Sequence, residues 1–131
     1  MLVAVVTDRK IAYLYLSELK SPRALSALKR MLPLRVKLHA SGELLMISLD
    51  LSVAPEGHRT VFCKGDVAYW PPAATIIIPT SAPCVHLASP ASYLGSVVKG
   101  LEELIRVGRR GEEVTLLTTD WEDVEGSFTD T

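Results

Sequence analysis

The 131-residue sequence contains no asparagine, no glutamine and no strong excess of either charge. Without asparagine there is no N-glycosylation site, and without either residue no carboxamide side chain can take part in catalysis. The formal net charge of -1 does not favour a nucleic acid as partner. No apolar run is long enough to span a membrane, and the first one, Leu2 to Val6, is soon followed by charged residues. These absences predict a soluble globular protein without a nucleic-acid or membrane partner.

Cysteine is also scarce, since only Cys63 and Cys84 are present. Two cysteines are too few for the disulfide framework of a small secreted protein, so we expect a cytoplasmic location. The two residues could still pair, because intracellular disulfides occur in hyperthermophiles. The missing amide residues and the many arginines point in the same direction, toward a thermophilic source.

Short apolar and alternating runs dominate the rest of the chain. They predict strands at residues 2–6, 11–16, 44–51, 60–63, 67–70, 75–78, 93–98 and 113–118, with another strand from residue 34 onward. A helix is expected to begin with Ser21 as N-cap and to end near Pro33, and a second to run from Gly100 to Val107 and end at Gly108. Residues 79–90 are expected to form a loop. Many short strands with two amphipathic helices predict one domain, residues 1–119, with a mainly β fold.

Two segments carry a family resemblance. Residues 65–72 read Gly-Asp-Val-Ala-Tyr-Trp-Pro-Pro, and residues 93–104 read Tyr-Leu-Gly-Ser-Val-Val-Lys-Gly-Leu-Glu-Glu-Leu. Both resemble segments of the small bacterial and archaeal cyclophilin-like proteins. The resemblance implies a closed cyclophilin-like β-barrel with two capping α-helices. Apart from the family, Gly65 is expected to need a positive φ, and the carboxylate of Asp66 to accept hydrogen bonds from nearby backbone amides.

The residues that make cyclophilins prolyl isomerases are missing from this sequence. The resemblance implies a catalytic arginine on the strand that corresponds to residues 46–51, which here read Met-Ile-Ser-Leu-Asp-Leu. Ile77 lies where a pocket phenylalanine is expected, and the loop before Tyr93 offers His86 but no tryptophan. A guanidinium supplies fixed charged donors that no residue of this strand can replace. We therefore expect a cleft of this fold without its isomerase chemistry.

Our first interpretation is a non-catalytic module that binds a small molecule or peptide and uses no cofactor. Because Tyr69 and Trp70 are adjacent on a strand, they point to opposite sides, and at least one is expected in the core. The cleft is predicted near six residues: Ser48, Asp50, Tyr69, Trp70, Ile77 and Tyr93. The alternatives are an enzyme of unknown reaction that uses this cleft, with Asp50 or His86 as acid–base group, and a structural subunit of an oligomer.

Cys84 and His86 lie two residues apart, so on an extended segment they would face the same side. Such a pair can contribute two metal ligands or a thiolate and an imidazole. Because no second ligand pair accompanies them, no metal site is predicted. Cys63, at the end of a strand, is interpreted as a small core residue.

Residues 120–131 form an acidic tail with five carboxylates and no lysine or arginine. The tail also carries Trp121, Val124 and Phe128, which favour docking on the domain or on another subunit. We therefore expect Trp121 to be at least half buried, and a homo-oligomer formed through the tail is one outcome of such docking.

Overall fold

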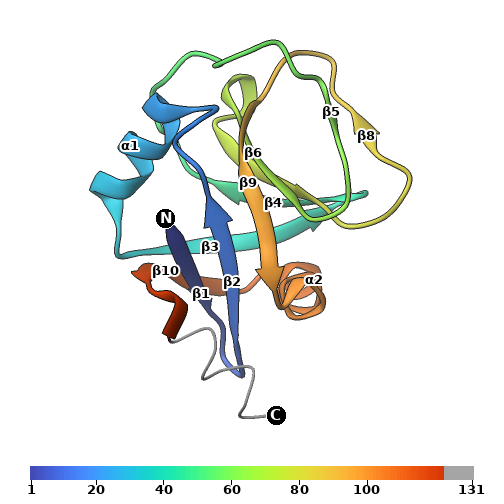
Figure 1. Ribbon diagram of the computed structural model, residues 1–131. Helices are drawn as coiled ribbons and strands as arrows, with labels where there is room; N and C mark the ends of the chain where they lie inside the picture. Colours follow the sequence, from blue (N-terminus) through green and yellow to red (C-terminus); the bar gives the residue numbers. More distant parts are fainter. Residues whose placement is uncertain (123–131) are drawn as a thin grey trace.

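Eight antiparallel strands close into a barrel in the computed structural model, which describes residues 1–122 (Figure 1). Around the barrel the order is β1 (Leu2–Val6), β10 (Glu113–Thr119), β3 (Leu34–Ser41), β4 (Leu44–Ser48), β7 (Thr75–Pro79), β6 (Asp66–Trp70), β9 (Ser92–Lys99) and β2 (Ile11–Leu16), which pairs with β1 again. Each strand is paired on both sides, so the barrel leaves no open sheet edge. The predicted closed barrel is confirmed.

Alternate residues of each strand fill the barrel. On β1, Val3 and Val5 point into the main core, whereas Leu2 and Ala4 belong to a separate cluster outside it. This alternation follows from the two-residue period of a strand, and the same period produced the strand predictions from the sequence. The interior is therefore a packed hydrophobic core and not a channel.

Two helices complete this core, α1 (Pro22–Met31) and α2 (Leu101–Arg110), which lie well apart in Figure 1. Leu25 and Leu28 of α1 and Leu104 and Val107 of α2 belong to the same buried cluster as the inward residues of the barrel. The predicted arrangement of two helices packed onto one barrel core is therefore confirmed. Within residues 1–122, no helix is long and apolar enough to span a membrane.

The start of α1 differs from the prediction in the side chain that caps it. Ser21 lies at the N-cap position but makes no capping bond, since its hydroxyl donates to the carbonyl oxygen of Tyr93 at 2.7 Å. The carboxylate of Glu56 accepts hydrogen bonds from the backbone amides of Arg23 and Ala24, at 2.8 and 2.9 Å. A carboxylate at a helix N-terminus satisfies free amides and complements the helix dipole. The predicted N-cap position of Ser21 is therefore confirmed, but the side chain that caps the helix comes from a distant loop.

The prediction that α2 ends at Gly108 is wrong. The helix continues to Arg110, and Gly111 ends it with φ 67°, its amide bonding to the carbonyl of Gly108. Gly108 is buried, and a Cβ there would lie 2.5 Å from Cδ2 of Leu45. Gly108 is therefore glycine for close packing and not for helix termination.

Two strand boundaries also need correction. The strand expected over residues 44–51 ends at Ser48, and the one expected over 60–63 is reduced to β5 (Val61–Phe62). Within the expected loop at 79–90, β8 (Val85–His86) pairs with β5 in a separate two-stranded sheet. The short helical turn η1 (Pro71–Ala73) links β6 to β7. The loops therefore contain a small structure of their own.

Candidate functional site

The outer face of four neighbouring barrel strands carries a third apolar cluster. It belongs to β4, β7, β6 and β9, whose inward residues fill the barrel. The outward residues of these strands in the cluster are Leu44, Met46, Ile77, Ala68, Trp70 and Tyr93. Side chains along a strand alternate between the core and the outer face, and the outer face is usually polar. An apolar outer face therefore requires a separate cover or partner.

This face is covered in part by two loop segments, residues 59–64 and 80–91, which we call the flap. In Figure 1 the two strands of the flap, β5 and β8, lie side by side. The flap contributes Phe62, Val85 and Leu87 to the outer cluster. Phe62 and Ile77 are fully buried there, whereas Trp70 and Tyr93 remain partly exposed. The flap thus covers Ile77 and leaves an aromatic border open to solvent.

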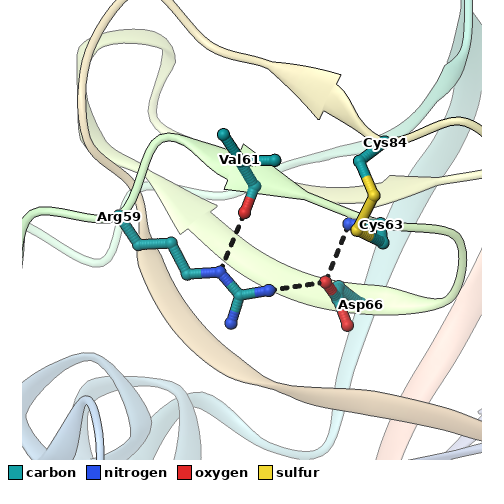
Figure 2. The surroundings of a disulfide bond; sticks show 5 residues. All are labelled: Arg59, Val61, Cys63, Asp66 and Cys84. Atoms are coloured by element: carbon teal, nitrogen blue, oxygen red, sulfur yellow. Dashed lines mark hydrogen bonds and ion pairs between the residues drawn. A yellow bond between two sulfur atoms is a disulfide. The ribbon is translucent and has the colours of Figure 1, made fainter.

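A disulfide between Cys63 and Cys84 joins the two halves of the flap (Figure 2). The bond overturns the interpretation of Cys63 as a core residue, because its side chain is partly exposed and covalently paired. It also removes the thiolate from the hypothetical pair of Cys84 and His86. In the described part of the chain, no group of three or more histidine, cysteine, aspartate or glutamate residues could hold a metal ion.

Arg59 fastens the flap to the barrel. Its Nη2 forms an ion pair with Oδ2 of Asp66 at 2.9 Å, and its Nε donates to the carbonyl of Val61 at 2.8 Å (Figure 2). The guanidinium lies over the rings of Phe62 and Tyr93, 4.8 and 4.6 Å from their centroids. Such stacking adds to the stabilisation from the ion pair, which is modest because the Arg59 side chain is about half exposed.

Sequence reasoning missed Arg59, because it occupies an irregular polar loop and its partners are set only by the fold. The expectation for Asp66 is confirmed, since its Oδ2 accepts the backbone amide of Cys63 at 2.8 Å. The expected positive φ of Gly65 is also confirmed, at 85°.

Tyr69 and Trp70 point to opposite sides of β6, as predicted. Tyr69 is buried in the barrel core, where its hydroxyl accepts the amide of Leu51 at 3.1 Å and donates to Oδ1 of Asp50 at 3.5 Å. Trp70 lies outside, and its Nε1 donates to the hydroxyl of Ser89 in the flap at 2.9 Å. The outward indole is therefore the accessible member of the pair.

The six residues predicted for the cleft lie in three places. Trp70, Ile77 and Tyr93 lie together on the outer face, whereas Asp50 lies with the Tyr69 hydroxyl. Ser48 is exposed and borders an open hollow of about 450 Å³, together with Lys37, His39 and the end of α2. The structure therefore brings three of the six together on one face.

A polar network lies apart from this face, where the turn between β1 and β2 approaches α2. Nε and Nη2 of Arg106 donate to the carboxylate of Glu103 at 2.7 and 2.9 Å, and Nη2 also donates to Asp8 at 2.6 Å. The hydroxyl of Thr7 donates to Oε2 of the same carboxylate, the oxygen that also accepts from Nη2 of Arg106. The hydrogen bonds from Arg106, and then that from Thr7, lower the pKa of Glu103 from 4.5 to about 2 although burial opposes this shift. This network keeps a buried carboxylate ionised and joins the hairpin to the helix.

The closed barrel, its two helices and an outer face bordered by Trp70 and Tyr93 define a cyclophilin-like architecture. The sequence model of the family described as Cyclophilin-like matches residues 1–117, and the chain belongs to this family. A solution structure of a hypothetical protein from Archaeoglobus fulgidus is similar, with a TM-score of 0.73 and 23% sequence identity. The alignment covers 91% of this chain and 95% of that one, so the two share a fold. No curated protein matches the sequence.

Proposed function

We propose that this chain is a binding module, with a small molecule or a short peptide as its ligand and without prolyl isomerase activity. The observation that carries the proposal is the partly exposed aromatic border of Trp70 and Tyr93 beside the apolar outer face. Aromatic rings offer a large contact area at low entropic cost, and the indole and phenol groups add hydrogen-bonding ability. Ile77 lies beneath this site, under the flap.

The chemistry of the same face supports binding over catalysis. The strand segment 46–51, which corresponds to the arginine-bearing strand of the isomerases it resembles, contains no cation. Arg59 is the guanidinium at this face, but two of its three nitrogens are engaged by Asp66 and Val61. A substrate carbonyl would have to compete with an ion pair for these donors.

Neither residue proposed for acid–base chemistry has supporting geometry on this face. Oδ1 of Asp50 accepts the amide of Ser52 at 2.8 Å, which is a local turn contact. His86 is exposed on β8, where its neighbour across the ladder is Val61. The enzyme alternative therefore receives no support from a specific contact.

An NMR titration tests the proposal with the peptide Ala-Ala-Pro-Phe and with a library of small aromatic and heterocyclic compounds. The indole Nε1–H resonances of Trp70 and Trp121 serve as internal probe and control. We expect a saturable shift of the Trp70 resonance at micromolar to millimolar ligand, which is retained in Trp121→Phe. In Trp70→Phe, binding followed through the ligand's own resonances should be weakened. No saturable shift at Trp70 with any probe would contradict the proposal.

We also propose a heat-adapted, cytoplasmic protein. The Cys63–Cys84 disulfide fits such a source, because hyperthermophiles keep disulfides inside the cell, and the absence of asparagine and glutamine removes thermolabile side chains. We expect a melting temperature above about 90 °C by calorimetry, whereas one in the mesophilic range of about 45–65 °C would contradict heat adaptation.

A further inference from the structure

The disulfide lies at one end of a hairpin that belongs to the barrel. Cys63 lies three residues before Asp66, where β6 begins, and Cys84 lies five residues after Pro79, where β7 ends. The two strands pair with each other between these ends, and each also pairs with another barrel strand, β9 or β4. Cleaving the disulfide would therefore leave every barrel ladder in place and free only the connections outside it.

Without the disulfide, few backbone hydrogen bonds join the two segments of the flap to each other. The β5–β8 ladder has only two residue pairs, Val61 with His86 and Phe62 with Val85. Two further backbone bonds extend it, from Leu87 N to Thr60 O at 2.8 Å and from Ala91 N to Arg59 O at 3.0 Å. A two-stranded ribbon of this length is marginal by itself, so after reduction the flap depends on the packing of its apolar side chains and on the ion pair of Arg59 with Asp66.

The flap covers the centre of the face that we propose for binding. Ile77 and Ala68 are fully buried under it, and the partly exposed Trp70 and Tyr93 lie at its border. The indole of Trp70 donates a hydrogen bond to Ser89 of the flap, and the guanidinium of Arg59, also in the flap, stacks on the ring of Tyr93. Movement of the flap would therefore change both the depth of the face and the surroundings of its aromatic residues.

We infer that the Cys63–Cys84 disulfide is a redox-controlled clasp, and that its reduction opens the flap and deepens the binding face toward Ile77. Both cysteines are partly exposed, and the neighbouring Lys64, Ala82 and Pro83 are exposed, so a reductant can reach the bond. The inference rests on the proposed function, because the face that opens is the one proposed to take the ligand. Its occupant is the same small molecule or short peptide.

The reductant is a dithiol. One of its thiolates attacks a sulfur of the disulfide and forms a mixed disulfide, which releases the other cysteine as a thiolate. The second thiol of the reductant then displaces the first cysteine. Two electrons and two protons end on Cys63 and Cys84 as two thiols, and the reductant leaves as its own disulfide. An oxidised dithiol reverses the step and closes the flap.

Hydrogen exchange followed by NMR tests the clasp on the full chain, with and without dithiothreitol. The reporters are the amides of Leu87 and Ala91, which bond across the flap, and the amides of β1 and β10 serve as references. On reduction we expect the two flap amides to exchange about ten-fold faster or more, with the reference strands unchanged. The double variant Cys63→Ser/Cys84→Ser should exchange like the reduced protein, with or without the reductant.

A binding measurement in both redox states separates this inference from the proposed function. It uses the peptide or compound that shifts the Trp70 resonance. Faster flap exchange with tighter binding after reduction supports both. Faster flap exchange without binding in either state overturns the proposed function and the ligand gate, but leaves the opening of the flap established. Unchanged exchange at Leu87 and Ala91, or equal loss of protection in β1 and β10, overturns the clasp whatever the ligand does.

Discussion

Protonation of Glu103 should destabilise the protein in a defined pH range. The side chain is 8% exposed and receives hydrogen bonds from Arg106 and Thr7. These bonds lower its pKa from 4.5 to about 2 in the folded state. The difference corresponds to about 3 kcal/mol of stability, because each pKa unit is worth about 1.4 kcal/mol.

The direction of the pKa shift determines how stability changes with pH. The folded state holds the proton less tightly than the unfolded state, so ionised Glu103 stabilises the fold. This contribution is complete above the unfolded pKa of 4.5 and is lost progressively as the pH falls toward about 2. The hydrogen bond from Arg106 also lowers the pKa of Asp8, which is exposed.

The substitution Glu103→Gln tests this pH dependence. The amide keeps the shape but lacks the charge, and it leaves the partly buried guanidinium of Arg106 with less compensation. We expect a loss of about 2–3 kcal/mol at pH 7, measured by urea unfolding, and little further loss between pH 4.5 and pH 2 from this site. Glu102→Gln, an exposed neighbour on the same helix, serves as the control and should behave like the parent. Equal pH slopes in the parent and Glu103→Gln would refute the reasoning.

Two further predictions concern stability. Gly65→Val should reduce the free energy of unfolding by about 1–2 kcal/mol through backbone strain at φ 85°, and so lower the melting temperature. Gly95→Ala should lower both further, because its Cβ would lie 1.9 Å from the backbone oxygen of Tyr15. An unchanged melting temperature in Gly65→Val, or a Gly95→Ala protein as stable as Gly65→Val, would contradict this order. Deleting residues 120–131 should lower the melting temperature or change the oligomeric state, because Trp121 is 50% exposed and stacks on Tyr15 with ring centroids 6.1 Å apart. Calorimetry and light scattering that both match the full chain would leave the tail without a docking role.

Local patterns predicted most of the barrel because strands reveal themselves through a period of two. Residues 75–78 and 113–118 were found in this way, and the family resemblance at residues 65–72 supplied the closure of the sheet. The same local patterns placed the N-cap of α1 at Ser21 but could not supply the capping side chain, since Glu56 reaches the helix from more than thirty residues away. The burial of Ile77 also escaped prediction, because its cover comes from a flap without strand periodicity.

The disulfide and the Arg59 contacts show the same limit. Cys63 and Cys84 are separated by 21 positions, and nothing in their local sequences states that the two loops meet. The tail is only partly tested, because Val124 and Phe128 lie outside the described residues. Trp121 is 50% exposed, which only just reaches the half burial expected for this residue. Contacts between loops depend on the closed barrel, and sequence patterns alone cannot supply them.

We expect this barrel to bind a ligand on its Trp70 and Tyr93 face without isomerising proline. NMR exchange spectroscopy on the peptide Ala-Ala-Pro-Phe, with the protein present at substoichiometric concentration, tests both halves in one sample. We predict a ligand-dependent shift of the Trp70 indole resonance, with cis and trans peptide signals that interconvert at the uncatalysed rate, over tens to hundreds of seconds. Exchange cross-peaks between the cis and trans signals within a mixing time of about one second would contradict this expectation, because uncatalysed isomerisation is far slower.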